Sequence, residues 1–343
     1  MELEFSADQD ELRDAIRAVL TKEHPVALAR KVAEGGEPAT DLWQTFAQLG
    51  WPALTVPEAD GGIGLGMIEA GILAEELGRV IAPGPLLCTV TQFVPALREL
   101  GTAAQRTRFL EPIAAGTRCG SLAIVEPGTR TARYVIEGDA VDDLVVIDGD
   151  QAFVVAAAGL TTTPVHAFDA TRRLAHVELA GVRVDDDHVL GAATPAGIAR
   201  TLEEATVGIA LEMVGASQTL FDITLEYAKQ REQFGVPIGS FQAIKHKFAD
   251  MMVALERARA TAYFAALTIA EDDERRALAT SVAKVAAGDC QRLIAKEGIQ
   301  IHGGIGYTWE HDVQLYVKRI KSGEQLFGTR SAHKARIADL LGV

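Results

Sequence analysis

The chain has 343 residues and a formal net charge of −14, with 33 Lys and Arg against 47 Asp and Glu. This length exceeds one comfortable hydrophobic core, so two or three sub-domains are expected. The acidic balance argues against non-specific binding to nucleic acid and against an anionic membrane surface. No apolar run approaches the ~18 residues of a membrane span, so no transmembrane helix is predicted. The acidic N-terminus lacks a signal-peptide layout, and three scattered cysteines indicate a reducing, cytoplasmic location.

Residues 1–120 are predicted to be helical, beginning with an N-cap at Ser6. The glycine-rich stretch Gly61–Gly66 follows no apolar strand and lies in no βαβ unit. It is therefore interpreted as a tight loop rather than a phosphate cradle. Amphipathic helices are expected over residues 41–50, 67–79 and 103–115.

From Ser121 to about Gly191 the hydrophobic period changes to two, which predicts short strands separated by Gly, Asp and Thr. Residues 121–192 are therefore expected to form a small antiparallel β domain. The remainder, residues 193–343, is helical again and predicts a four-helix bundle. The fold class is α+β, mainly α, with bundle segments at about 195–229, 240–271, 274–300 and 309–341.

Three groups of motifs stand out from this background. The block Gln300–Asp312 combines one Gln, two His, three Gly, Tyr and Trp, too polar and too aromatic for a plain connector. The other motifs are Arg231–Gly235, Pro237–Ile238 and Phe241–Gln242, and, N-terminally, Leu49–Trp51, Val56–Glu58, Gly61–Gly64 and Glu75–Gly78. Together the three groups resemble, in order and over nearly the whole chain, the signatures of the acyl-CoA dehydrogenase family. Those proteins are flavoproteins that desaturate acyl-CoA thioesters.

The resemblance implies FAD as cofactor and an acyl-CoA as substrate. In the family a base removes an α proton while the β hydrogen leaves as hydride to the flavin. The flavin lies between subunits, with its ring on the β domain of one chain and its adenosine and pyrophosphate on a partner. Guanidinium suits pyrophosphate, and glycines permit backbone approach. The matching cofactor-binding residues are Arg231, Phe234, Gln242, Gln300, Gly303, Gly304 and, at a position that approaches the flavin, Thr329.

The chain departs from the family at the catalytic base. One branch places a glutamate before a Gly-Thr pair, and that position holds Phe327 here. Another branch places it on the first bundle helix, at the position of Ala205. Glu204 is adjacent but points ~100° away around the helix, and Glu212 lies ~10 Å further along the axis. The β domain is also short and contains no tryptophan.

Three hypotheses follow. The first is a subunit of a heterotetrameric acyl-CoA dehydrogenase, in which a larger paralogue supplies the base for fatty-acid or steroid side-chain oxidation. The second is a self-sufficient homo-oligomer with a displaced base, and the third is a flavin-free scaffold. An electron-transfer acceptor is expected for either enzyme. No metal site is predicted, because His302 and His311 lack a carboxylate partner. Displaced-base candidates are, in order, Glu212, Glu204, Glu203 and Glu324.

Overall fold

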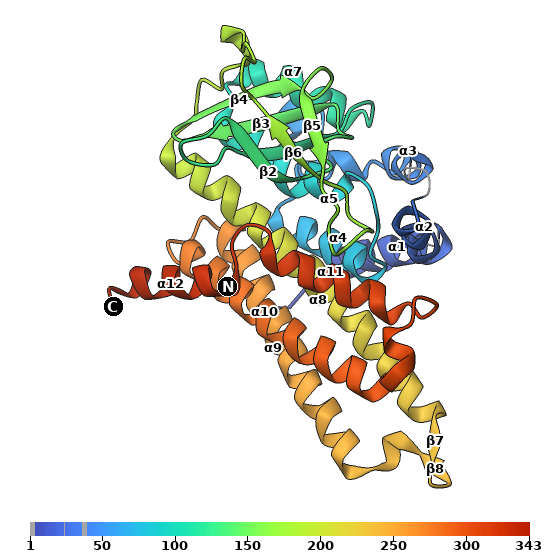
Figure 1. Cartoon of the computed structure of the whole chain (residues 1–343). Helices are drawn as coiled ribbons and strands as arrows, with labels where there is room; N and C mark the ends of the chain where they lie inside the picture. Colours follow the sequence, from blue (N-terminus) through green and yellow to red (C-terminus); the bar gives the residue numbers. More distant parts are fainter. Residues whose placement is uncertain (1–3, 24, 36–39) are drawn as a thin grey trace. The chain divides into compact units, whose positions relative to one another are not determined.

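The computed structural model describes residues 4–23, 25–35 and 40–343. Two compact units are distinguished by their internal contacts. The bundle unit comprises Met1–Arg30, Gly71–Ala82 and Ile209–Val343, and the sheet unit comprises Lys31–Ala70 and Pro83–Gly208. Helices α2 (Pro25–Ala33), α4 (Met67–Arg79) and α8 (Pro195–Gln230) contribute residues to both units. The fold is mainly helical with small sheets, as predicted, whereas the expected boundaries at residues 120 and 192 stay a prediction (Figure 1).

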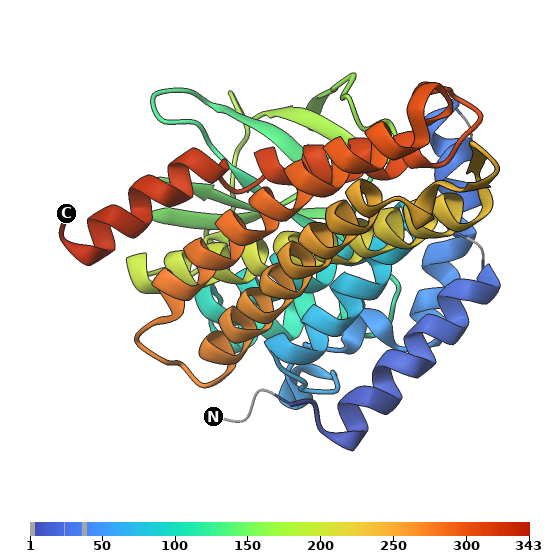
Figure 2. The ribbon, with the colours of Figure 1, turned by 90° about the horizontal axis from the view of Figure 1, so that it is seen from below.

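Long helices form the bundle unit, and α10 packs against α9, α11 and α12 (Figure 2). Small buried side chains such as Ala262 of α9 and Ala287 of α10 allow close approach of the helices. No helix among the described residues is long and apolar enough to cross a membrane. The elements are α1 (Ala7–Glu23), the C-terminal parts of α4 and α8, α9 (Gln242–Ala270), α10 (Arg276–His302), α11 (Val313–Gln325) and α12 (Arg330–Leu341).

The segment predicted as one helix over 309–341 is two helices. α11 ends at Gln325, and α12 begins at Arg330 after a turn. Within this turn Phe327 and Gly328 have φ values of 53° and 99°. A right-handed helix cannot continue through two left-handed residues, so the chain changes direction there.

The motif Glu75–Gly78 joins α4 to the rest of the bundle unit. A Cβ at Gly78 would lie 2.1 Å from the carbonyl oxygen of Glu212, so only glycine allows this contact between α4 and α8. The buried Glu75 carboxylate accepts hydrogen bonds from Arg259 Nε at 2.9 Å and from the Tyr263 hydroxyl at 2.7 Å. This motif is therefore explained by packing within the unit.

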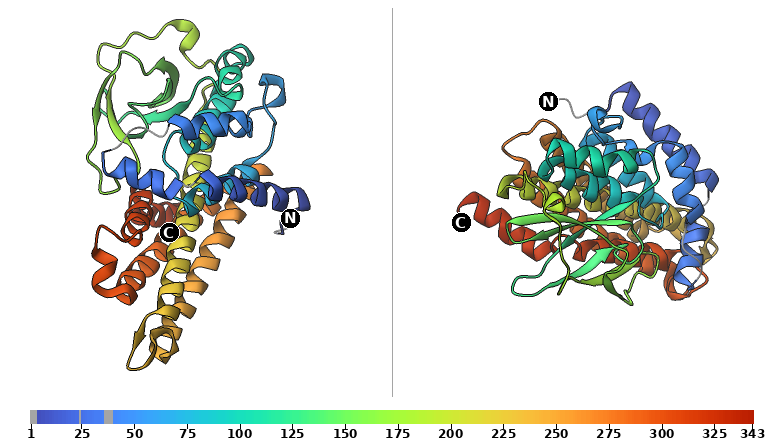
Figure 3. Two further views of the ribbon diagram at one scale, coloured as in Figure 1. Left: turned by 90° about the vertical axis from the view of Figure 1, so that its right-hand side faces the viewer. Right: turned by 90° about the horizontal axis from the view of Figure 1, so that it is seen from above.

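Two three-stranded sheets form the centre of the sheet unit (Figure 3). Their orders are β1-β3-β4 and β2-β6-β5, and every pairing is antiparallel except the parallel pair of β1 with β3. The strands are β1 (Gly120–Ile124), β2 (Thr131–Ile136), β3 (Asp143–Asp148), β4 (Gln151–Ala156), β5 (Thr161–Pro164) and β6 (Leu174–Glu178). The helices are α3 (Thr40–Gln48), η1 (Trp51–Ala53), η2 (Glu58–Asp60), α5 (Leu86–Cys88), the π-helical η3 (Thr89–Phe93), α6 (Val94–Leu100), α7 (Ala103–Ala114) and η4 (Asp186–His188).

The stretch Gly61–Gly66 folds back on the segment before it. Backbone N–H groups of Ile63 and Gly64 donate to the carbonyls of Ala53 and Val56 at 3.0 and 2.9 Å. A Cβ at Gly62 would lie 2.0 Å from the Val56 carbonyl oxygen. The glycines are needed for this close internal packing, so the interpretation as a tight loop is confirmed.

Candidate functional site

A short hairpin carries the first group of predicted cofactor residues. It joins α8 to α9 through β7 (Glu232–Gln233) and β8 (Val236–Pro237), at the end of both helices in Figure 1. The turn residues Phe234 and Gly235 have φ values of 55° and 80°, as a type I′ turn requires. Phe234 is 94% exposed, although exposure of a large phenyl ring brings no folding advantage. A strained, exposed aromatic residue is typical of a binding surface.

Arg231 stands at the base of this hairpin. Its backbone N–H donates to Tyr227 O, and its carbonyl accepts from Ile238 N, both at 2.8 Å. Its side chain is exposed. Among the residues that the structure describes, its guanidinium has no ion-pair or hydrogen-bond partner. Gln242 is the exposed first residue of α9, and the neighbouring Phe241 contacts Phe234 with ring centroids 6.2 Å apart.

The second group lies at the C-terminal end of α10. Gln300 is exposed in the last turn, and Gly303 follows with φ 64° and ψ −140°, a conformation essentially restricted to glycine. A Cβ at Gly303 or Gly304 would meet nothing within 4 Å. Gly304 has neither a positive φ nor a close neighbour, so folding of this chain does not require glycine there. Its backbone is open to a ligand.

A stack of aromatic rings brings these two groups together. The rings of Tyr227 and His302 lie 4.4 Å apart at 24°, and the Tyr227 hydroxyl donates to His302 O at 3.4 Å. Tyr227 is one helical turn before Arg231, and His302 immediately precedes Gly303. The sequence reasoning missed Tyr227. An aromatic residue four positions before a motif arginine is the only signal that could have indicated it.

The His302 ring is neutral in this stack. Its Nδ1 lies 2.8 Å from Gly298 O, so Nδ1 carries the proton and donates to that carbonyl. Burial lowers the pKa of His302 below 6.5, and the nearby His311, at 5.0 Å between ring centroids, acts in the same direction. The ring therefore supports the glycine turn by stacking rather than by charge.

Thr329 is placed away from these two groups. It is the N-cap of α12, and its hydroxyl accepts from Ala332 N at 3.3 Å, which accounts for a threonine at this position. α12 packs on the N-terminal part of α10, as Ser281 shows by its contact with His333. From Lys284 to His302 the helix rises roughly 27 Å. The structure therefore does not bring Thr329 together with the glycine turn.

Neither family base position holds an ionisable group. Ala205 is fully buried, and Phe327 is half-buried with its backbone in the left-handed region. Glu324, three residues before Phe327, accepts hydrogen bonds from Gln291 Nε2 at 2.5 Å and from Arg292 Nη2 at 2.9 Å. Its carboxylate is directed into these internal contacts.

The three base candidates of α8, Glu203, Glu204 and Glu212, are also buried. Glu204 pairs with Arg98, and burial raises the pKa of its carboxyl group. Glu203 is 2% exposed. Glu212 Oε1 lies 2.9 Å from Arg319 Nη1, with both side chains buried. Arg98 and Arg319 were not foreseen, because pairs separated by 106 and 107 residues leave no local signal.

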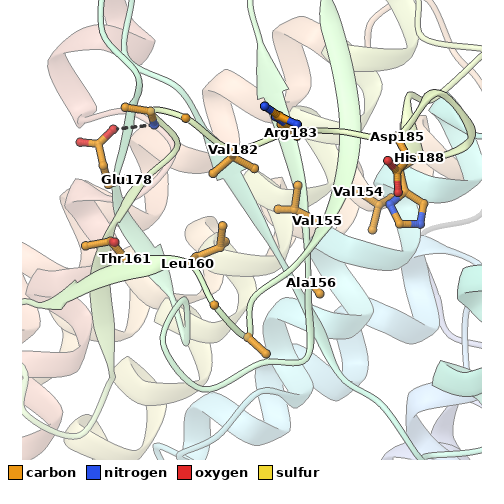
Figure 4. Close-up of a pocket in the computed structure, with 14 residues that line it drawn as sticks. Val154, Val155, Ala156, Leu160, Thr161, Glu178, Val182, Arg183, Asp185 and His188 are labelled. Carbon is orange, nitrogen blue, oxygen red and sulfur yellow. Dashed lines mark hydrogen bonds between the residues drawn. The ribbon is translucent and has the colours of Figure 1, made fainter.

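A separate hollow of about 470 Å³ lies in the sheet unit, against the end of β4 and the loop after β6 (Figure 4). It is lined by Val155, Leu160, Arg183 and other residues, and none of the predicted site residues is among them. The Glu178 carboxylate at its edge accepts the N–H groups of Leu179 and Ala180 at 3.0 and 2.9 Å. The residues that line this hollow are thus different from those predicted to contact the cofactor.

Comparison with known families identifies the chain. Residues 6–117 match the model described as "Acyl-CoA dehydrogenase, N-terminal domain", and residues 197–342 match "Acyl-CoA dehydrogenase, C-terminal domain". The chain belongs to the acyl-CoA dehydrogenase family. The predicted family and enzyme class, an FAD-dependent acyl-CoA dehydrogenase, are thereby confirmed.

Individual relatives agree with this assignment. Acyl-CoA dehydrogenase IpdE2 of Mycolicibacterium smegmatis is 34% identical over 329 residues, covering 94% of this chain and 96% of the relative. The solved ChsE4–ChsE5 complex of Mycobacterium tuberculosis shares the fold, with a TM-score of 0.91, 23% identity and coverage of 100% and 99%. A steroid acyl-CoA dehydrogenase, Tcur3481–Tcur3483, has a TM-score of 0.86 and 28% identity, with 98% of each chain covered.

Proposed function

We propose that this chain is an FAD-binding subunit of a heteromeric acyl-CoA dehydrogenase whose partner, a larger paralogue, supplies the catalytic base. The proposal rests on a set of exposed residues whose presence is not explained by packing within the chain. Arg231, Phe234 and Gly304 are exposed, and none of them is explained by packing within the chain. We call these three residues, with Gln242, Gln300 and Gly303, the tail surface.

The tail surface fits the diphosphate and adenosine of FAD. The guanidinium of Arg231, which has no partner in the part of the chain that the structure describes, can pair with a diphosphate, and the bare backbone at Gly304 permits close approach of phosphate oxygens. Phe234 offers an apolar ring face to a purine. When bound, the flavin supplies the acceptor for hydride, and this chain's residues bind and orient its tail.

The need for a partner subunit follows from the residues at the two family base positions. A proton acceptor is needed at the α carbon, and Phe327 and Ala205 cannot take a proton. The steroid acyl-CoA dehydrogenase among the solved relatives supports a bulky acyl-CoA as substrate. The complex we propose is a cytoplasmic heterotetramer that passes electrons to an electron-transfer acceptor.

The decisive experiment is expression of this chain alone and together with a candidate paralogous subunit of the same source. The flavin-to-polypeptide ratio and the acyl-CoA-dependent reduction of an artificial acceptor are measured for both preparations. We expect a yellow, active complex only with the paralogue; full activity of this chain alone contradicts the proposal. Within the complex, Arg231→Met should lower flavin content. Lys229→Met serves as the matched control, because Lys229 is also exposed but pairs with Glu226.

A self-sufficient homo-oligomer with Glu212 as a displaced base is the second candidate. The Glu212–Arg319 pair opposes it, since a base must turn its carboxylate towards the substrate and leave a buried guanidinium unpaired. Turnover by the Glu212→Gln variant of the isolated chain tests whether Glu212 is the base. Loss of turnover with retained flavin would support Glu212 as the base, whereas unchanged turnover would exclude Glu212.

A flavin-free scaffold, the third candidate, is tested by the absorption spectrum of the purified complex.

A further inference from the structure

Helix α9 packs with one face inside the bundle unit and leaves the opposite face open. The inner face carries buried residues such as Met251, Leu255 and Ala258, and the helix packs against α10. On the outer face Val253 is 70% exposed, and its neighbour Met252 is 43% exposed. A valine exposed in the middle of a helix brings no folding advantage, because it buries little apolar surface and is a poorer helix former than alanine. Contact with another molecule would account for it.

The outer face repeats with the seven-residue period of a seam between two helices. His246, Val253 and Ala260 are one heptad apart, and Ala249 and Glu256 repeat at the position between them. All five residues are exposed. The a and d positions of a coiled coil have this spacing. The two alanines are small enough to let a second helix approach, so the spacing favours a helix as the contacting element.

Two opposite charges flank the seam on the same side. Asp250 and Arg257 are seven residues apart, so they are offset by only ~20° around the helix but by about 10 Å along it, too far to pair with each other. Among the residues that the structure describes, the exposed Asp250 has no ion-pair or hydrogen-bond partner. Arg257 is also exposed and reaches only Asp289, at 3.9 Å. Both side chains can therefore meet charges of another molecule.

The positions of these charges are complementary to a second copy of the same helix. The midpoint between Asp250 and Arg257 falls next to Val253. If a second α9 lies antiparallel across a two-fold axis at Val253, Asp250 of each copy faces Arg257 of the other, and two ion pairs form. A parallel arrangement would instead bring like charges together, which is unfavourable. A two-fold contact of one surface with itself is the commonest way in which identical chains form a closed dimer.

We propose that two copies of this chain associate through antiparallel α9 helices, with Val253 on the two-fold axis and Asp250 paired with the partner's Arg257. This contact goes beyond the proposed function, because it joins two identical chains rather than this chain and its paralogue. The face provides fewer residues than the roughly 20–30 on each side of a standard interface. Association of the chain by itself should therefore be weak and dependent on concentration.

The first test is sedimentation velocity of the full chain over a series of concentrations. The wild-type chain should dimerise, and Asp250→Arg or Arg257→Asp should each weaken dimerisation about 10-fold or more, because like charges then face each other twice. The double variant Asp250→Arg/Arg257→Asp should restore dimerisation, since both ion pairs form again with reversed polarity. Asp150→Arg is the matched control, because Asp150 is an exposed carboxylate of the sheet unit, and it should behave as wild type.

The second test places a cysteine on the proposed axis. The native cysteines Cys88, Cys119 and Cys290 are buried, so they should not contribute cross-links. Val253→Cys should form a disulfide between two copies under mild oxidation, both in the chain alone and in the complex with the paralogue. Ala104→Cys, at an exposed position of α7, should not.

The two tests contradict the inference in different ways. A double charge variant that associates as weakly as the single variants overturns it, and so does the absence of a disulfide from Val253→Cys in both preparations. If the wild-type chain alone stays monomeric at every concentration, the disulfide in the complex decides. Neither test measures flavin content or turnover, so a failure here leaves the proposed function standing.

Discussion

Replacement of Gly304 by alanine separates a folding role from a binding role at the glycine turn. An alanine Cβ at this position meets no atom within 4 Å, and the backbone does not need positive φ. The free energy of unfolding should therefore stay the same or rise by up to ~1 kcal/mol, because alanine restricts the unfolded chain. A methyl group standing between the backbone and a diphosphate should weaken FAD binding about 10- to 100-fold, which corresponds to about 1.4–2.7 kcal/mol.

The assay combines FAD titration of the apo complex, followed by flavin fluorescence, with urea unfolding of the same preparation. Gly303→Ala is the matched control. It introduces an equally unobstructed methyl group but forces alanine into φ 64° and ψ −140°, which should cost about 1–3 kcal/mol of folding stability. Equal FAD affinity in wild type and Gly304→Ala would refute the reasoning that a ligand approaches this backbone.

Three further results are expected from the bundle unit. Glu75→Ala should destabilise the protein by about 3 kcal/mol in urea unfolding, because it leaves buried partners unpaired; Tyr263→Phe, which removes only one of the hydrogen bonds, should cost less. Gly78→Ala should prevent soluble expression or lower the melting temperature strongly, since its Cβ would lie 2.1 Å from a carbonyl oxygen of α8; a normal melting temperature contradicts the close contact. Burial lowers the pKa of His302 and His333 below 6.5, so the unfolded chain binds more protons and stability should fall as pH drops below 6.5. Replacing both by Gln should flatten that slope in pH-dependent unfolding, and an unchanged slope contradicts the assignment.

Local periodicity was sufficient for most helices of this chain. The prediction of 67–79 coincides with α4, where an apolar stripe and a closing Gly78 and Arg79 mark the helix and its end. It failed at 309–341, where α11 ends at Gln325 and α12 begins at Arg330. Gly328 and the N-cap Thr329 are local signals of this break, whereas the positive φ of Phe327 is one that residue preference does not predict.

The residues of the candidate site could be predicted from the sequence, but their placement in space could not. Motif residues such as Arg231 and Gln300 could be named from the resemblance, but their mutual placement depends on the stack of Tyr227 on His302. That contact joins residues 75 positions apart and has no periodic pattern. Their roles in holding FAD stay a prediction. The ion pair of Glu212 with Arg319 was likewise not visible in the sequence, where Glu212 is marked only by its apolar surroundings and by sharing a helical face with Ala205.

The motifs of this chain divide by whether its own folding explains them. Glu75 and Gly78 are buried and satisfied by α9 and α8, so they would be needed even without a ligand. Arg231, Phe234 and Gly304 are exposed, and packing within the described part of the chain does not account for an exposed phenyl ring at Phe234 or for glycine at 304. An external ligand or partner would account for residues of the second kind. The family base positions hold apolar residues while this outward surface is intact, which supports the proposal that this chain contributes to binding and that a partner supplies the base.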